Sequence, residues 1–112
     1  MLKANLTAIQ KITENTLTDV ADSFARDLLK EGGLDEYFTH SLGHGVGLEI
    51  HEYPTLSKRM SVPLKNKMVF TIEPGVYFDG EFGIRIEDTV LLTDGKVERL
   101  FTDDKKLLII KK

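Results

Sequence analysis

The sequence contains no cysteine at all. This absence excludes a disulfide framework and a zinc site built from thiolates, so any metal ion would have to be held by nitrogen and oxygen. Cationic charge is also scarce, since 15 Lys and Arg residues stand against 18 Asp and Glu residues, for a formal net charge of -3. The sequence therefore lacks the basic footprint of a nucleic-acid-binding protein, and we expect no nucleic-acid partner.

Long apolar runs are missing too. No stretch approaches the roughly 20 apolar residues that a helix needs to cross a bilayer, and the first residues lack the basic start and apolar run of a secretory signal. We therefore expect no membrane insertion and a cytoplasmic location. The 112 residues are enough for one small domain, and a composition of 41% hydrophobic and 29% charged residues is ordinary for a folded protein.

The first third of the sequence has helical periodicity. Apolar residues recur at helical spacing over residues 2–9, and a stronger apolar stripe covers residues 20–29, so we expect two helices. Thr16 and Thr18 offer side-chain oxygens that could cap the second helix. Gly32 and Gly33 can supply the left-handed residue that ends it.

The rest of the sequence is typical of strands joined by tight turns, because runs rich in Val, Ile, Phe and Tyr alternate with Gly, Pro and Asp. Asp-Gly pairs at 79–80 and 94–95 favour hairpins, so consecutive strands should pair antiparallel. The tail 103–110 could form a last helix or strand, with its apolar end docked on the sheet. The expected fold is α+β, with two N-terminal helices packed on a mainly antiparallel sheet. The expected strands are 68–77, 83–92 and 96–100.

Imidazoles and carboxylates are spread over three short segments punctuated by glycine, a pattern that suits a divalent metal site. In a strand, residues two apart share a face. Glu73 would therefore share a face with Thr71, and Glu87 with Arg85, while Ile84 and Ile86 would face the core. If the hairpin at 79–80 pairs these strands, Glu73 and Glu87 meet, and two close carboxylates repel unless a proton or cation lies between them. The residues concerned are His40, His44, His51, Glu73, Arg85 and Glu87.

Two common motifs are excluded around the histidines. Gly43, Gly45 and Gly47 do not form a dinucleotide loop, because the third glycine of G-x-G-x-x-G is missing, and Thr55 stands where H-E-x-x-H needs its second histidine. Each candidate also has an ordinary explanation. A histidine in a glycine-rich turn is usually a hydrogen-bonded or exposed residue, Glu73 can simply end a strand, and an arginine–glutamate pair can be a surface ion pair. Four other acidic residues are expected to be solvated or in turns: Glu52, Asp79, Asp88 and Asp94.

Three segments together, residues 43–52, 68–77 and 83–90, resemble the C-terminal half of the pita-bread metallopeptidases, in the branch of Xaa-Pro dipeptidase (prolidase) and Xaa-Pro aminopeptidase. The two leading helices also resemble the family's segment before its glycine-histidine motif, so the resemblance covers nearly the whole chain. It implies that residues 1–112 form a single partial domain, the C-terminal half of a metallopeptidase catalytic domain. The implied activity is metal-dependent hydrolysis of Xaa-Pro peptide bonds.

The resemblance also implies roles for the residues. His44, Glu73 and Glu87 would be metal ligands, with Glu87 bridging two divalent ions and Glu73 also acting as general base. The ions would be manganese, with cobalt or zinc as alternatives. His40 and His51 would line the site of the Xaa-Pro peptide substrate, hold its scissile carbonyl and stabilise the tetrahedral intermediate as catalytic residues. Arg85 would support the metal ligands or contact the substrate.

One departure from the family is large. Its site needs two aspartates from the N-terminal half, and this sequence offers no counterpart with the family's flanking pattern. Three hypotheses follow: an incomplete catalytic half, a composite site completed by a second copy or a separate N-terminal half, or a noncatalytic binding or scaffold module. A creatinase-like hydrolase on the same fold also stays open. A half-domain should expose a sheet face, so we expect self-association.

Overall fold

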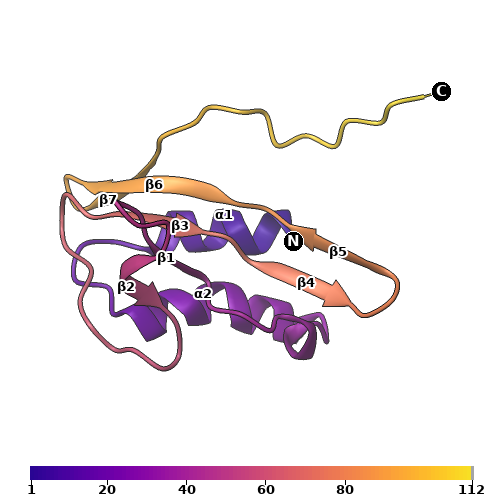
Figure 1. Cartoon of the computed structure of the whole chain (residues 1–112), viewed down its shortest axis with the longest axis horizontal. Coiled ribbons are helices and arrows are strands. Elements are labelled where there is room, and N and C mark those ends of the chain that lie inside the picture. The colour runs from indigo at the N-terminus through magenta and orange to yellow at the C-terminus, as the bar shows by residue number, and fades with distance from the viewer. Residues whose placement is uncertain (112) are drawn as a thin grey trace.

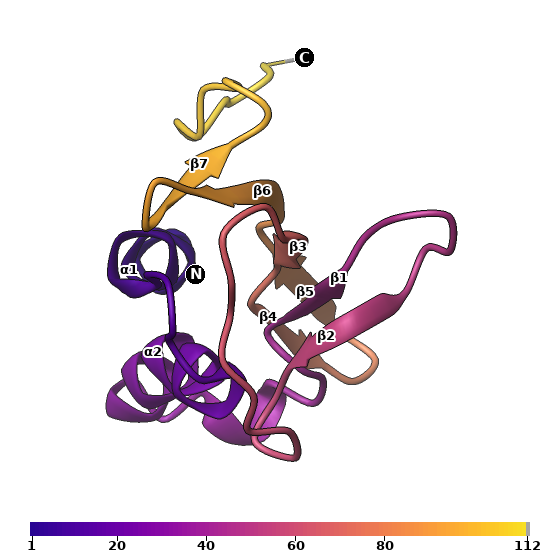
Figure 2. The same ribbon diagram turned by 90° about the vertical axis from the view of Figure 1, so that its left-hand side faces the viewer.

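The computed structural model describes residues 1–111. Over this range the chain forms two α-helices on one face of a five-stranded antiparallel sheet, and a separate two-stranded hairpin extends beyond it (Figures 1 and 2). The expected α+β fold is thus confirmed. The elements are α1 (Leu2–Lys11), α2 (Thr18–Glu31), the 3-10 turn η1 (Asp35–Tyr37), β1 (Gly43–Gly45), β2 (Glu52–Leu56), β3 (Val69–Ile72), β4 (Gly75–Phe78), β5 (Phe82–Arg85), β6 (Asp88–Thr93) and β7 (Lys96–Arg99).

The two helices form where the periodicity predicts them, but the predicted capping of α2 is wrong. Its N-cap is Leu17, and no side chain caps it. The Thr18 hydroxyl instead donates to the Met60 carbonyl at 2.5 Å, because this side chain is buried against the segment that covers the helix start. The C-terminal prediction is confirmed, since Gly33 has a φ of 67° and its amide donates to Lys30.

The large sheet has the strand order β2-β1-β3-β6-β7, and β4 pairs only with β5. The predicted strand 68–77 is therefore two strands, β3 and β4, and the predicted strand 83–92 is likewise divided into β5 and β6. Pro74 explains the first interruption, because proline has no amide hydrogen to continue a ladder. The two interruptions lie side by side. The pairing of β3 with β6 ends at Ile72 and Asp88, and the pairing of β4 with β5 begins at Gly75 and Arg85.

The predicted turns and the last strand are confirmed. The pairs at 79–80 and 94–95 connect β4 to β5 and β6 to β7, and each connected pair is antiparallel. Gly80, Asp94 and Gly95 have φ values of 73°, 49° and 76°, the left-handed conformation that such hairpin turns require. The predicted strand 96–100 corresponds to β7.

The core lies between the sheet and the helices. Buried Phe70, Ile72, Val90 and Leu92 from β3 and β6 face small alanines on the helices, which lets helix and sheet approach closely. The expected placing of Ile84 in this core is wrong, because its side chain is 47% exposed, and Ile86 is only half-buried. The cause is the strand interruption, since the hairpin that carries Ile84 belongs to a second sheet.

The tail does not dock as expected. Residues 100–111 form neither helix nor strand, and the apolar side chains of residues 107–110 are between 71% and 87% exposed. Figure 1 shows this yellow segment running away from the sheet. Lys105 is tied back through contacts with Asn5 and Asp88, and the Asp103 carbonyl accepts from Arg99. The tail therefore contacts the folded part through the charged side chain of Lys105 and the carbonyl of Asp103, and its apolar side chains are exposed to solvent.

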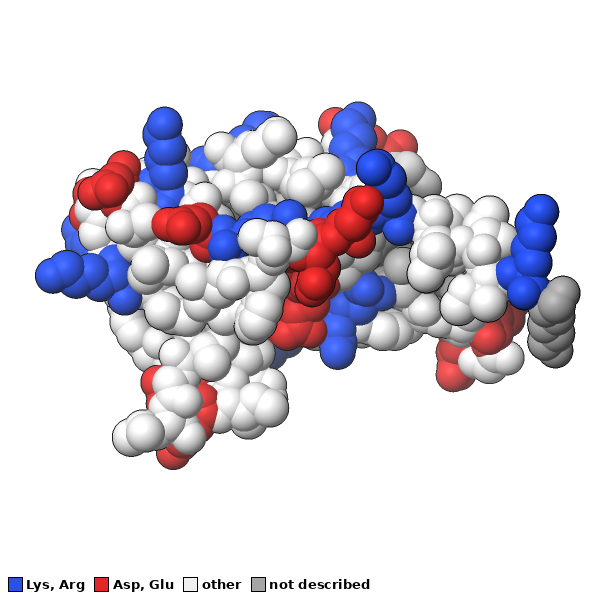
Figure 3. All heavy atoms as spheres, turned by 90° about the horizontal axis from the view of Figure 1, so that it is seen from above, with Lys and Arg blue, Asp and Glu red and all other residues white. Residues whose placement is uncertain are grey.

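Charge is mixed over one face of the molecule. In the face shown in Figure 3, lysine and arginine side chains are interspersed with aspartates and glutamates, and neither sign dominates. None of the helices within residues 1–111 combines the length and apolar character needed to cross a membrane.

Candidate metallopeptidase site

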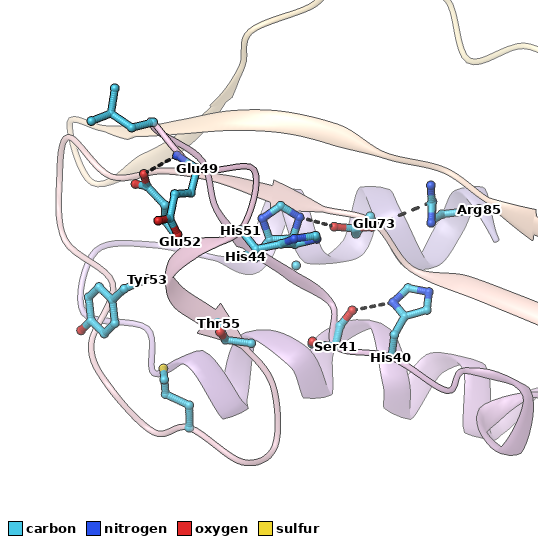
Figure 4. Close-up of a pocket in the computed structure, with 13 residues that line it drawn as sticks. His40, Ser41, His44, Glu49, His51, Glu52, Tyr53, Thr55, Glu73 and Arg85 are labelled. Atoms are coloured by element: carbon cyan, nitrogen blue, oxygen red, sulfur yellow. Dashed lines mark hydrogen bonds and ion pairs between the residues drawn. The ribbon is translucent and has the colours of Figure 1, made fainter.

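A cavity of about 910 Å³ opens beside β1 and the end of β3. Five of the six predicted site residues line it: His40, His44, His51, Glu73 and Arg85. Figure 4 shows their side chains converging from different segments of the chain. Glu87 does not line the cavity but contacts Arg85, which does. The structure thus brings together residues that are up to 47 positions apart in the sequence, from 40 to 87.

Glycines place His44 in the cavity wall. β1 lies between β2 and β3, and a Cβ added to Gly43 would collide with the Thr71 carbonyl, while one added to Gly45 would collide with the Tyr53 carbonyl. Only glycine therefore allows the neighbouring backbones to approach on both sides of His44. The alternating glycines are explained by this close packing.

The ring of His44 is oriented by its own strand. Its Nδ1 lies 2.9 Å from the Gly45 carbonyl oxygen, which can only accept, so Nδ1 donates and carries a proton. In the neutral ring Nε2 then presents a lone pair, and it lies 3.2 Å from Oε1 of Glu73. Two acceptors at this distance repel, so a proton or a cation must lie between them. Ligands at about 2.0–2.2 Å from one metal ion suit this separation.

Glu73 is 9% exposed and is held through its side chain and its backbone. The Thr71 hydroxyl donates to Oε1 at 2.7 Å, as the expected sharing of a face requires. The backbone amide of Glu73 donates to Leu42 at 2.7 Å, which fixes the residue outside the strand ladder. On the cavity side, Nε of Arg85 lies 3.9 Å from Oε2.

Arg85 joins the two glutamates. Its Nε is 3.5 Å from Oε2 of Glu87 and 3.9 Å from Oε2 of Glu73, so both carboxylates lie beside the same guanidinium. Tyr77 raises the pKa of Arg85 most, burial opposes this, and the charges of Glu87 and Glu73 raise it further. Arg85 is therefore a permanent cation at the position where the two carboxylates need one.

The remaining histidines lie on either side of this group. The His51 ring is 4.3 Å from the His44 ring, centroid to centroid. His40 donates from Nδ1 to the Ser41 carbonyl at 2.8 Å, so its Nε2 accepts from the hydroxyl of Tyr77 at 2.9 Å. Tyr77, on β4, was not singled out by the sequence, because a tyrosine in a strand gives no local sign of the histidine it meets.

A pair on α2 holds the segment that carries His40. Arg26 donates to the carbonyls of Phe38 and His40 at 2.8 and 2.9 Å, and its Nε lies 2.6 Å from Asp22. Asp22 is 1% exposed and also accepts from the Leu42 amide at 3.0 Å. Sequence reasoning missed this pair as well, although the spacing of four on a helix is a recognisable signal for an ion pair.

The side chains present are of the types that bind divalent metal ions, but they are too few to complete a metal site. Imidazole and carboxylate oxygens suit divalent first-row metals, and His44 and Glu73 are already at a suitable separation. Glu87 reaches the pair only through Arg85, and its side chain is 41% exposed. Within residues 1–111, no group of three or more histidine and acidic side chains is placed to hold an ion. The described residues therefore offer two suitable donors, His44 and Glu73, and not a complete metal site.

Comparison with known proteins identifies the family. The model of metallopeptidase family M24 matches residues 1–94. The chain belongs to this M24 family. Over 108 residues it is 46% identical to an Xaa-Pro dipeptidase from Pyrococcus furiosus and 39% identical to one from Lactobacillus helveticus, covering 96% of this chain in both cases. It spans 31% and 29% of the length of these two proteins.

Solved structures agree with the M24 assignment. A prolidase from Pyrococcus furiosus matches with a TM-score of 0.91 and 46% identity, covering 93% of this chain and 31% of that one. An Xaa-Pro dipeptidase from Bacillus anthracis matches with a TM-score of 0.94 and 41% identity, covering 97% and 31%. The resemblance to the C-terminal half of the pita-bread peptidases is thereby confirmed.

Proposed function

We propose that this chain supplies one wall of the active site of an Xaa-Pro metallopeptidase, which hydrolyses the bond before proline. The relatives named above support the reaction class, and they include both Xaa-Pro dipeptidases and, among solved structures, an X-Pro aminopeptidase from Thermotoga maritima at 42% identity. The observation that carries the proposal is the contact between the His44 lone pair and the Glu73 carboxylate, with Arg85 and Glu87 beside it. The absence of cysteine suits a cytoplasmic location.

His44, Glu73 and Glu87 would hold the metal, which we propose to be a pair of manganese ions, with cobalt or zinc able to replace them. When bound, divalent ions lower the pKa of water and polarise a peptide carbonyl. The neutral tautomer of His44 leaves Nε2 free for this purpose, because the Gly45 carbonyl holds the proton on Nδ1. Three protein ligands from one wall leave coordination positions for groups from an opposite wall.

Glu73 is the proposed general base. Its carboxylate is nearly buried, and the Thr71 hydroxyl fixes Oε1, so Oε2 is left facing the cavity and can take a proton from the attacking water. His51 is the proposed partner of the scissile carbonyl, because a ring N–H from the cavity wall can stabilise the oxygen as negative charge develops. His40, whose two ring nitrogens are engaged with Ser41 and Tyr77, is proposed to line the substrate site beside it. Arg85 is half-exposed and can pair with a substrate carboxylate.

A second candidate function is a noncatalytic module, favoured by the finding that residues 1–111 contain no complete group of three metal-binding side chains. We favour an incomplete catalytic half of the peptidase, and a site completed by another polypeptide, either a second copy or a separate N-terminal half, is the alternative. The convergence of His40, His44, His51, Glu73 and Arg85 on one cavity favours the peptidase function over a scaffold.

A chimera tests the peptidase proposal. This chain would replace the matching 108 residues of the Pyrococcus furiosus Xaa-Pro dipeptidase, and hydrolysis of an Xaa-Pro dipeptide would be measured with and without Mn²⁺. We expect metal-dependent hydrolysis that Glu73→Gln abolishes, whereas Glu98→Gln on exposed β7 leaves it intact. A folded chimera whose hydrolysis is absent, or independent of Glu73, would refute the proposal. A dipeptide without proline and creatine serve as specificity controls.

A further inference from the structure

Glu73 and Glu87 both lie where strand pairing is interrupted. Pairing between β3 and β6 ends at Ile72 and Asp88, and pairing between β4 and β5 begins at Gly75 and Arg85. Across the interruption the Ile86 amide donates to the Pro74 carbonyl at 3.3 Å. Proline offers no amide hydrogen in return, so the backbone ladder alone gives weak control over where the two glutamates stand.

One side chain from outside the sheet reaches this interruption. Asn5, on α1, is fully buried, and its Nδ2 donates to the carbonyl oxygens of Ile72 and Ile86 at 3.2 and 3.3 Å. Ile72 immediately precedes Glu73, and Ile86 immediately precedes Glu87. A single amide group therefore ties together the two backbone positions that carry the carboxylates.

The orientation of the Asn5 amide is fixed by its surroundings. Its Oδ1 accepts from Nζ of Lys105 at 2.5 Å, and an ammonium can only donate, so Nδ2 must face the sheet. Nδ2 also lies 3.0 Å from Oδ2 of Asp88, so its two hydrogens are shared among three acceptors. Asp88 is itself held by Arg99 and Lys105. These cations counter the charge of Asp88, and the amide is left no favourable flipped state.

The presence of an asparagine here needs a reason. The other buried residues of α1 are Ala4 and Ala8, and an apolar residue at position 5 would satisfy packing without burying an amide. A buried amide is tolerated when its donors and acceptor are satisfied, and Asn5 achieves this with the sheet backbone, Asp88 and Lys105. Two of its hydrogen-bond acceptors are the carbonyls at which strand pairing is interrupted.

We propose that Asn5 is a positioning residue that sets the separation of the Glu73 and Glu87 carboxylates. It touches neither substrate nor metal, and it acts through the carbonyls of Ile72 and Ile86. The metal-binding part of this inference rests on the proposed function, whereas the tie between the two backbone segments stands independently. Loss of the Nδ2 donors would let the backbone move locally around Glu73 and Glu87. The pairing of β3 with β6 would keep the rest of the sheet intact.

The test uses Asn5→Leu in the full chain, with amide hydrogen exchange followed by NMR. We expect exchange at Ile86 to accelerate about tenfold while exchange at Leu92 in β6 changes little, and Mn²⁺ affinity to fall about tenfold. Asn5→Asp is the second variant, because it keeps the size and the Lys105 contact but lacks the donors. We expect the same local acceleration from it.

Thr18→Val is the matched control. Thr18 is equally buried and bonds to the backbone of Met60 and Val62, away from the glutamates, so its loss should lower stability without a selective effect at Ile86. The inference is overturned if both Asn5 variants leave Ile86 exchange unchanged, or accelerate Ile86 and Leu92 alike. If the wild-type chain binds no Mn²⁺, the proposed function fails. The difference in hydrogen exchange between Ile86 and Leu92 still decides whether Asn5 has the proposed role.

Discussion

Thr71 is the residue on which the site's internal hydrogen bonding depends. Its hydroxyl donates to Glu73 at 2.7 Å and accepts from the His44 amide at 3.0 Å. Thr71→Val leaves a buried carboxylate and a backbone amide without this partner, so we expect a loss of about 1–3 kcal/mol in the free energy of unfolding. Urea denaturation measures it. Thr55→Val, on the cavity rim, serves as control with an expected change below about 0.5 kcal/mol.

Asp88 should give the stability of the chain a pH dependence. Burial raises the pKa of this carboxyl, but hydrogen bonds from Lys105, Asn5 and Arg99 outweigh burial and hold the pKa below its ordinary value. The stabilisation is therefore fully present above the unfolded pKa of about 3.9 and is lost as the pH falls through the lower folded value. Asp88→Asn should destabilise the chain by about 2 kcal/mol at pH 7.

Thermal unfolding of the wild type and Asp88→Asn from pH 7 down to pH 2 measures this difference. We expect the gap between the two proteins to be constant to about pH 4 and to narrow below it. A gap that stays constant over the whole range would show that the Asp88 charge does not stabilise the fold.

At the residue scale, sequence reasoning finds residues that act through charge and spacing, and misses those that act through burial. His44, Glu73, Arg85 and Glu87 do come together, because strand alternation and a hairpin turn are local rules. Asp88 was expected to be solvated, and it is 6% exposed among cations from β7 and the tail. Partners so distant in sequence leave no local signal.

Among the elements, β1 makes the strictest demand on side-chain size. Gly43→Ala should destabilise the fold by about 3 kcal/mol or more, because the new methyl group would collide with backbone atoms of Thr71, which cannot move without disturbing β3. Gly32→Ala is the matched control, since it has space for a Cβ and no positive φ. Denaturant midpoints measure both, and equal midpoints would contradict the close packing described for β1.

The boundaries of helices and strands were predicted correctly where a glycine or a turn marks them. The predictions were wrong where strand pairing sets the boundary. The strand predicted over 68–77 contains Pro74, whose missing amide is the signal for the interruption. The matching interruption before β6 carries no such signal, because it follows from pairing with the first. Alternation within each part still held, and this is why Thr71 and Glu73 meet although the strand ends between them.

For the whole molecule, exposed apolar surface predicts self-association. The loop between β1 and β2 exposes Leu48 and Ile50 at 105% and 77%, and the tail exposes residues 107–110. Contiguous apolar groups of this kind are typical of interaction surfaces. We expect light scattering of the full chain to show particles larger than a monomer, and a chain ending at Lys106 to associate less with its unfolding temperature unchanged.

A matched control for the truncation keeps the tail length and replaces Leu108 and Ile110 by serine. It should associate as little as the shortened chain, because the effect is assigned to apolar side chains. A full-length chain that stays a monodisperse monomer at high concentration would contradict the expectation of an uncovered surface.

The family could be predicted from the sequence, but a complete site could not. The family and the half of the fold were recognisable from short motifs, because those motifs are dense in glycine, histidine and acidic residues. The groups that would complete a metal site were not recognisable, since the chain spans only 31% of the length of its relative from Pyrococcus furiosus.

A native mass spectrum of the full chain with and without Mn²⁺ tests the central claim most directly, because it reports assembly and metal content together. We predict that an assembled particle binds Mn²⁺ and that Glu73→Gln removes the metal without changing the assembly, since Glu73 lies beside the His44 lone pair. Glu98→Gln should bind as the wild type does. If no particle of any size binds Mn²⁺ in a manner that depends on Glu73, these residues do not form part of a metal site.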